Sequence, residues 1–293
     1  MGQRANFEET YTGKSLQGSY IAGVYYPDKT RVGWWKNGYP EYFAKVLNSC
    51  NWIGLNVKVD GETLDLNTAT AVTDFYRELD MKSGLLKRSF QATLPSGKML
   101  VINTERFVSI VKDEIGALSY SITPINFSGS IEMCSYLDFD VENEDSNYDE
   151  KFWESVSCGQ ENGSSYVHAK TKKTNFEVSV AMRNYTAIDG AGVAWDSTSE
   201  ATHMYVCECA SFNIQQGQTL QVNKFAAVLS SMNHSAADLD INAATIAASA
   251  ARTGYTQLRD EHAAAWHNKW ETSDIEIEGD AEAQQGIRFN IFH

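Results

Sequence analysis

From residue 51 onwards, apolar and polar residues alternate along the chain with a period of two. Leu55, Val57 and Val59 set this pattern, and the Asp60-Gly61 pair that follows is a strong hairpin-turn signal. Side chains of a β-strand point alternately to its two faces, so each run of this kind buries one face of a sheet. The alternation therefore predicts a mainly β fold, a large antiparallel sandwich.

Short runs with turn residues between them define the predicted strands. They lie at residues 86–94, 99–107, 107–112, 117–125, 131–141, 166–171, 176–184, 203–210 and 219–229. One earlier strand is predicted at residues 20–26, ahead of an aromatic-rich loop from Val32 to Phe43. No helical pattern interrupts these runs, so residues 1–231 are predicted to form one N-terminal β domain.

Past the last predicted strand, the apolar period becomes that of a helix. Ser235, with Asp238 three residues on, resembles a capping box. The residues at helical spacing are Ile241, Ala244, Ala248 and Ala251. Gly254 supplies a stop signal, and a second helix follows almost directly. Residues 232–273 are predicted to form a helical linker, a two-helix hairpin.

A third helix is predicted at the C-terminal end of the sequence. Asp280 is a good N-cap, and Ile287 and Ile291 fall on one helical face. No glycine, proline or basic turn ends this helix before His293, and nothing in the sequence covers its apolar face. We therefore expect that more protein follows, and that residues 274–293 begin a further unit.

Composition excludes several classes of protein. Apolar residues make up 43% of the chain, aromatic residues 12% and charged residues 21%, which is globular composition. A net charge of −14 argues against a nucleic-acid partner, because phosphate binding requires clustered Lys and Arg. No apolar run approaches the length of a membrane span, and no apolar signal segment follows Met1. We expect a cytoplasmic protein without a membrane partner.

The five cysteines are scattered, at Cys50, Cys134, Cys158, Cys207 and Cys209. Cys207 and Cys209 alternate with other residues, so they are predicted to share one face of a strand. We interpret all five as small buried hydrophobic residues and not as metal or redox ligands. No cluster of cysteine or histidine completes a zinc site, and no metal is predicted.

Residue chemistry alone indicates no catalytic residue. The carboxylates are abundant, but the sequence does not show that any two of them face one scissile bond, as a glycosidase requires. Trp34 and Trp35 are adjacent in the aromatic-rich loop, and Trp rings offer the flat apolar faces on which sugars stack. The same two residues could equally lie in an interface or in the core, and we favour this interpretation over sugar stacking.

Several spaced motifs together resemble one family. They are Gly2–Glu9, Phe75–Arg88, Asn126–Gly129, Trp266–Trp270, Asp274–Asp280 and Gln284–Phe292. In combination they resemble glycoside hydrolase family 65, which contains the maltose, trehalose and kojibiose phosphorylases. The loop Lys29–Phe43 is most similar to the maltose phosphorylase branch.

The resemblance implies an N-terminal super-sandwich similar to the galactose mutarotase fold, then a helical linker and an (α/α)6 catalytic barrel. Residues 274–293 would be the first barrel helix, cut short. The implied reaction is an inverting phosphorolysis of a maltose-like disaccharide to β-glucose 1-phosphate and glucose. A barrel glutamate protonates the glycosidic oxygen, and inorganic phosphate is the co-substrate, with no further cofactor. None of those catalytic positions lies in this chain, so it is expected to be inactive alone.

Three residues of the first motif are candidates to face the barrel: Arg4, Asn6 and Glu8. The alternative, which we favour, is that they pin the N-terminal strand through local hydrogen bonds. Ala5 stands where the family has glycine, and the Gly-Asn-Gly strand that precedes the motif in the family is missing. A lost first strand exposes a sheet edge and favours a homodimer.

Two other functions fit the same sequence. The chain could be a free-standing carbohydrate-binding module, with Trp34 and Trp35 as its stacking surface, or part of a trehalose-hydrolysing member of the family. The interpretation that we prefer is a scaffold and oligomerisation domain of a phosphorylase.

Overall fold

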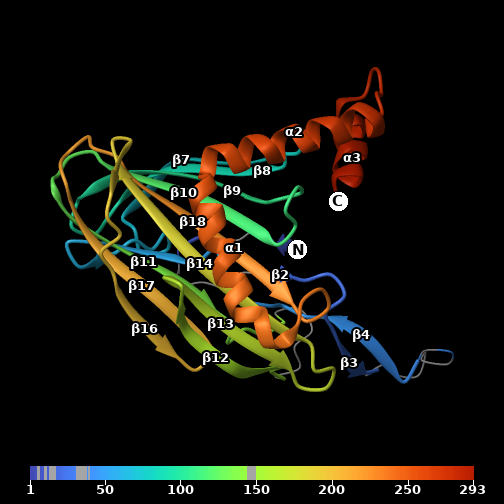
Figure 1. Ribbon diagram of the computed structural model, residues 1–293. Coiled ribbons are helices and arrows are strands. Elements are labelled where there is room, and N and C mark those ends of the chain that lie inside the picture. Colours follow the sequence, from blue (N-terminus) through green and yellow to red (C-terminus); the bar gives the residue numbers. More distant parts are fainter. Residues whose placement is uncertain (5–6, 10–11, 13–17, 31–37, 39, 144–149) are drawn as a thin grey trace.

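The computed structural model describes residues 1–4, 7–9, 12, 18–30, 38, 40–143 and 150–293. Within these residues, two antiparallel sheets are followed by three α-helices near the C-terminus (Figure 1). The fold is mainly antiparallel β with helices at the end, as the alternation of residues predicts.

The larger sheet has nine strands in the described part of the chain. In spatial order they are β12 (Trp153–Glu161), β13 (Ser164–Thr171), β14 (Glu177–Ile188), β18 (Leu220–Ser230), β10 (Ile115–Pro124), β9 (Met99–Val108), β8 (Leu85–Thr93) and β7 (Ala71–Asp80), with β15 (Ala191–Val193) beside β14. Consecutive strands mostly pair with each other, because short turns such as that at Ser96-Gly97 reverse the chain.

The smaller sheet has five strands among the described residues. Their order is β16 (Thr198–Thr202), β17 (Tyr205–Ile214), β11 (Gly129–Asp138), β5 (Leu55–Val59) and β6 (Glu62–Thr63). Two short ribbons lie apart from these sheets: β1 (Gly2–Arg4) with β2 (Gly18–Tyr20), and β3 (Tyr25–Lys29) with β4 (Tyr42–Val46).

The main core lies between the two sheets. On β5, Leu55, Val57 and Val59 are fully buried, whereas Lys58 is exposed, so the alternation in the sequence does divide an inner face from an outer one. Side chains from the larger sheet, such as Phe90 and Ile102, meet these residues from the opposite side. This packing of two inner faces is that of a sandwich.

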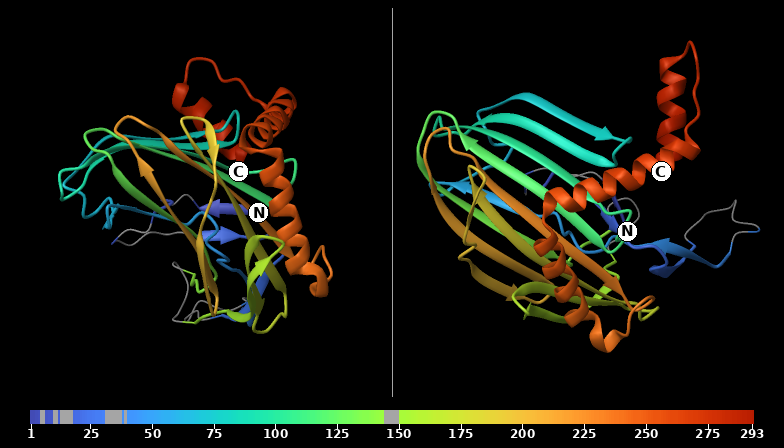
Figure 2. Two further views of the ribbon diagram at one scale, coloured as in Figure 1. Left: turned by 60° about the vertical axis from the view of Figure 1, so that its left-hand side comes forward. Right: turned by 45° about the horizontal axis from the view of Figure 1, so that its top comes forward.

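The first helix, α1 (Leu239–Thr253), covers the outer face of the larger sheet (Figure 2). A 3₁₀ turn (η1, Ala236–Asp238) leads into this helix, whose alanines pack on Ala181, Ala227 and Leu229. Small side chains on both partners let this helix lie close to the sheet. Next, α2 (Tyr255–Ser273) is fastened at its far end, where Trp270 Nε1 donates to the carbonyl of Met81 at 2.8 Å.

The last helix, α3 (Ala281–Phe292), begins where the sequence predicts. Its N-cap Asp280 accepts a hydrogen bond from Ala283 N at 2.9 Å. Phe292 stacks on Trp266 of α2, with ring centroids 4.5 Å apart, and α3 has no fully buried residue. Among the described residues, no helix combines the length and the apolar character needed to cross a bilayer.

Two predicted strands differ in the structure. The run at residues 20–26 is broken by a turn at Ile21–Val24, where Gly23 adopts a φ of 80°. The run at residues 107–112 is also wrong, because β9 ends at Val108 and the backbone turns so that Lys112 N donates to Ser109 Oγ.

Two helical predictions differ as well. The capping box fails, since Ser235 makes no side-chain capping hydrogen bond. The helices α1 and α2 do not fold back as a hairpin but meet in a bend at Gly254 and continue in different directions (Figure 1). The domain boundaries after residues 231 and 273 stay predictions.

Candidate functional site

The Phe7-Glu8-Glu9 segment of the first motif lies between the two sheets and inserts both carboxylates into the core. The backbone carbonyl of Glu8 accepts from Leu55 N of the smaller sheet at 2.9 Å. Its carboxylate pairs with Arg106 of β9 in the larger sheet. One residue therefore connects the two layers of the sandwich.

Glu9 completes this buried cluster. Arg88 Nη2 on β8 donates to both Glu9 oxygens, at 2.8 and 2.7 Å, and lies 2.5 Å from Glu8. Tyr120 of β10 donates its hydroxyl to Glu9 at 2.6 Å. Arg88 and Tyr120 both stand opposite Thr104 of the strand between them, so the sheet register brings these partners into one row. We call Glu8, Glu9, Arg88, Arg106 and Tyr120 the paired cluster.

Electrostatics hold Glu8 of the paired cluster in its ionised form. Burial alone would raise the pKa of Glu8, but the charges of Arg106 and Arg88 outweigh it and lower the pKa below its usual value. Burial and the charge of Glu9 raise the pKa of the Tyr120 phenol, which stays a hydrogen-bond donor. Glu8, Glu9 and Arg88 are each at most 4% exposed, so the cluster offers no surface to a ligand. Its arrangement fastens the N-terminal segment to both sheets.

The other candidates of the first motif and the aromatic loop do not join Glu8. Arg4 lies on β1 with its guanidinium 5.8 Å from the Tyr20 ring centre, and it lines a cavity of only about 10 Å³. Such a space is large enough for about one water molecule. Asn6, Trp34 and Trp35 lie outside the described residues. The roles proposed for these residues stay predictions.

Another buried carboxylate, Glu208, was not found from the sequence. Glu208 lies on β17 between Val206 and Ala210, on the face of the strand that is turned towards the core. It accepts hydrogen bonds from Ser165 Oγ at 2.6 Å, from Asn184 Nδ2 at 3.0 Å and from Trp195 Nε1 at 2.8 Å. The signal in the sequence was a charged residue at an inward position of an alternating strand.

Unlike the paired cluster, Glu208 lies at a surface groove. The groove has a volume of about 400 Å³, within the range of small-molecule sites. Its lining is polar and aromatic and includes Arg183, Asn184, Tyr185 and Trp195. We call this the Glu208 groove.

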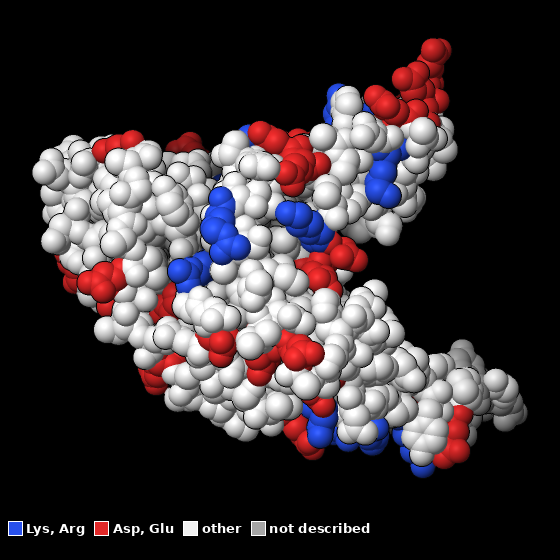
Figure 3. Space-filling view, viewed as in Figure 1, with Lys and Arg blue, Asp and Glu red and all other residues white. Residues whose placement is uncertain are grey.

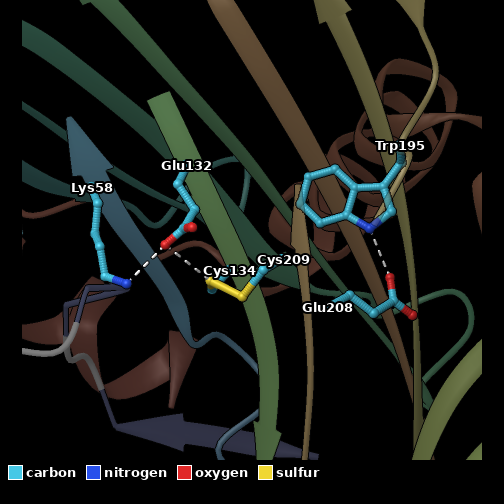
Figure 4. The surroundings of a disulfide bond; sticks show 6 residues. All are labelled: Lys58, Glu132, Cys134, Trp195, Glu208 and Cys209. Carbon is cyan, nitrogen blue, oxygen red and sulfur yellow. Dashed lines mark hydrogen bonds and ion pairs between the residues drawn. A yellow bond between two sulfur atoms is a disulfide. The ribbon is translucent and has the colours of Figure 1, made fainter. Parts of the chain in front are cut away.

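The strand behind Glu208 carries a disulfide, which corrects the interpretation of the cysteines. Cys134 of β11 stands directly opposite Cys209 of β17, and the two form a disulfide with Cα atoms 4.0 Å apart. Both are half-buried on the outer face of the sheet, on the other side of β17 from the Glu208 carboxylate (Figure 4). The expectation that Cys207 and Cys209 share a face holds, but pairing across strands could not be seen without the register.

The charges on the surface do not gather into a basic site. On the face that Figure 3 shows, Lys and Arg are interspersed with Asp and Glu. Among the described residues, no group of three or more His, Cys, Asp and Glu could hold a metal ion.

Known proteins resemble this chain in sequence and in structure. The profile described as "Glycosyl hydrolase family 65, N-terminal domain" matches residues 1–269. The chain is 41% identical over its whole length to maltose phosphorylase of Bacillus subtilis (strain 168) and covers 38% of that protein. It is 30% identical to α,α-trehalose phosphorylase of Thermoanaerobacter brockii and covers 39% of it.

A solved structure from the human microbiome, named as a kojibiose phosphorylase, superposes with a TM-score of 0.85. It is 23% identical, and the match covers 99% of this chain and 37% of that one. The chain thus spans less than two fifths of the length of these relatives. From its profile match and its identity to the phosphorylases, the chain belongs to glycosyl hydrolase family 65, of which it comprises the N-terminal β domain.

Proposed function

We propose that this chain is the N-terminal domain of a disaccharide phosphorylase that acts on maltose. Identity supports this substrate: the chain is 41% identical to a maltose phosphorylase, against 30% for a trehalose phosphorylase and 25% and 27% for two kojibiose phosphorylases. All four comparisons cover the whole chain. The proposed reaction is inverting phosphorolysis to β-glucose 1-phosphate and glucose, with inorganic phosphate as co-substrate.

The role proposed for this domain is that of a scaffold. The carboxylates that are buried most deeply, Glu8 and Glu9, are committed to ion pairs with arginine, so they are not available to protonate a glycosidic oxygen. The acid and the phosphate-binding residues of the reaction would lie in parts of the enzyme outside these residues.

A hollow in the surface is the proposed contact for the catalytic part of the enzyme. It lies between α3 and the ribbon of β3 and β4 (Figure 3). The elements on its two sides carry exposed large apolar side chains: Phe289 on α3, and Phe43 and Val46 on β4, are each 41–57% exposed. Large apolar side chains that are exposed on the elements beside a hollow are typical of an interface with another protein domain.

A chimera tests the proposal. Residues 1–293 would replace the aligned part of the Bacillus subtilis maltose phosphorylase, with the untouched parent enzyme as control. We expect the chimera to release β-glucose 1-phosphate from maltose and phosphate, and the isolated chain to release none. Turnover by the isolated chain, or a folded chimera without activity, contradicts the proposal.

Substituting Phe289→Glu in the chimera tests the hollow itself. We expect a loss of activity together with a lower unfolding temperature, because a charge would be buried against the catalytic part. Ile125→Glu is the matched control, since Ile125 is 37% exposed but follows β10 at the end of that strand opposite to the turn that contacts α2. Equal effects of the two substitutions would remove the hollow from the proposal.

Homodimer formation in the cytoplasm is part of the same proposal, with the aromatic loop at the contact. Light scattering of the wild type against Trp35→Ala tests it. We expect a dimer that the substitution weakens, and a monomer in both samples argues against a dimer.

A further inference from the structure

One edge of β14 is left open in the middle of the larger sheet. β13 pairs with β14 from Glu177 to Met182, and β15 pairs with it from Thr186 to Ile188 on the same side. The opposite side of β14 is occupied by β18 along nearly its whole length. Within the residues that the structure describes, no strand therefore pairs with positions 183–185 on the open side.

The Glu208 groove lies at this opening. Asn184 points inward from the open segment, and its Nδ2 donates to Glu208 at 3.0 Å. The carboxylate fixes the orientation of the amide, because the opposite orientation would bring two acceptor oxygens together. Asn184 Oδ1 is left buried and without a hydrogen-bond partner.

This oxygen is buried and lies out of reach of a ligand, so the accessible groups that line the groove decide what it binds. The surroundings define the chemistry of that ligand. Glu208 repels an anion, and its oxygens already accept from the N–H and O–H groups of three side chains, which leaves a poor site for a metal cation. Arg183 lines the groove, where its Nη1 donates to the carbonyl of Gly163.

Aromatic side chains complete the lining. Tyr185 is 47% exposed at the opening, and the Trp195 ring is held by Phe212, with centroids 6.0 Å apart. Flat apolar faces beside hydrogen-bonding groups match a sugar ring, whose faces carry C–H groups and whose edges carry hydroxyls.

We propose that the Glu208 groove binds a neutral saccharide, held by the polar and aromatic side chains that line it. A volume of about 400 Å³ is sufficient for one or two pyranose rings. The site is assembled from this chain alone, so the inference does not depend on the proposed phosphorolysis.

Calorimetric titration of the 293-residue chain with maltose, with glucose and with inorganic phosphate tests the site. We expect saturable binding of maltose and none of phosphate. Asn184→Ala should weaken maltose binding roughly tenfold, because the groove loses a polar side chain of its lining. Asn223→Ala is the matched control: it stands opposite Tyr185 on β18 but lines a different groove, and it should change affinity by less than about twofold.

A second variant covers the possibility that Asn184→Ala does not fold. Ser197 is half-buried at the rim of the groove, and Ser197→Trp should fill the groove and abolish maltose binding without a change in the sheets. The proposal is overturned if the wild type binds neither sugar. It is also overturned if it binds phosphate alone, or if folded Asn184→Ala and Ser197→Trp both bind maltose as the wild type does. Turnover by the chimera is a separate measurement, so either proposal can fail without the other.

Discussion

Glu8 and Glu208 are carboxylates buried in the interior of the same sandwich, and they are stabilised in opposite ways. Glu8 pairs with the guanidinium groups of Arg88 and Arg106 and is closed off from the surface. Glu208 accepts hydrogen bonds from neutral side chains only, among them Asn184 and Trp195, and lies at a groove.

The difference shows how one interior can serve two purposes. Ion pairs with arginine compensate the cost of burying a carboxylate but occupy its oxygens. The paired cluster therefore holds the N-terminal segment to the two sheets and binds no ligand. Neutral donors hold Glu208 beside a groove, and the carboxylate orients Asn184 in the lining of that groove. The predictions below separate these two roles, from the largest expected effect to the smallest.

Removing an arginine from the paired cluster should have the largest effect. Arg88→Met leaves Glu8 and Glu9 short of a counter-charge in the core, and we expect the free energy of unfolding to fall by roughly 3–5 kcal/mol. Urea denaturation measures the change. Lys58→Met is the control, since its ion pair with Glu132 at 2.8 Å is exposed (Figure 4) and should contribute about 1 kcal/mol or less. Similar losses for both variants would mean that the cluster is not a fastening device.

Removing the disulfide should destabilise the smaller sheet, which carries Glu208, and leave the larger sheet nearly unchanged. The pair Cys134→Ala and Cys209→Ala opens a link across 75 residues of sequence, and we expect a loss of roughly 2–4 kcal/mol. Hydrogen exchange should accelerate in β11 and β17 more than in β8 and β9. Cys158→Ala, at a half-buried free cysteine, is the control. Uniform acceleration over both sheets would contradict a local role.

Neutralising the second carboxylate should have a smaller effect than Arg88→Met. In Glu208→Gln, the new NH₂ group must face one of the donors Ser165, Asn184 or Trp195, and a loss of about 1–3 kcal/mol follows from the mismatch. Thermal unfolding and maltose titration should both report the change. The exposed Glu132→Gln serves as comparison, and a Glu208→Gln protein that is as stable and binds as well would argue against the groove.

The smallest expected effect, at most about 1.4 kcal/mol per pH unit, is on the pH dependence of stability. Burial lowers the pKa of Lys224 from 10.5 to about 7, against a smaller upward influence from Cys50 and Glu208. Between these values the unfolded chain binds a proton that the folded chain does not, so this group makes stability rise as pH increases from about 7 to 10.5. Lys224→Met should remove that rise from urea midpoints measured across the interval. An unchanged slope would mean that Lys224 does not cause the pH dependence in this interval.

The fold was predictable wherever one face of an element is buried. β5 alternates cleanly because it lies between β11 and the short β6 with its inner face in the core, and α3 begins at a capping aspartate. β7 was missed because it is an edge strand with mostly exposed side chains and an irregularity between Thr73 and Tyr76, so its sequence carries no period of two.

The sites were predictable only in part, because both depend on contacts between distant residues. Glu8 was a candidate from its motif, but its partner Arg106 is 98 residues away and is brought to it by the register of the larger sheet. Glu208 was visible as a charged residue on the inner face of β17. Its hydrogen-bond partners Asn184 and Trp195 could not be predicted, because they come from other strands and loops.

The opening at positions 183–185 also bears on self-association. A free strand edge can recruit a strand from a second molecule, and long flat edges are the usual starting points of aggregation. This edge extends over three residues and is flanked by β13 and β15, so it is too short to hold a foreign strand in register. This opening therefore leaves the interrupted sheet accessible to small molecules without itself offering a template for fibril growth.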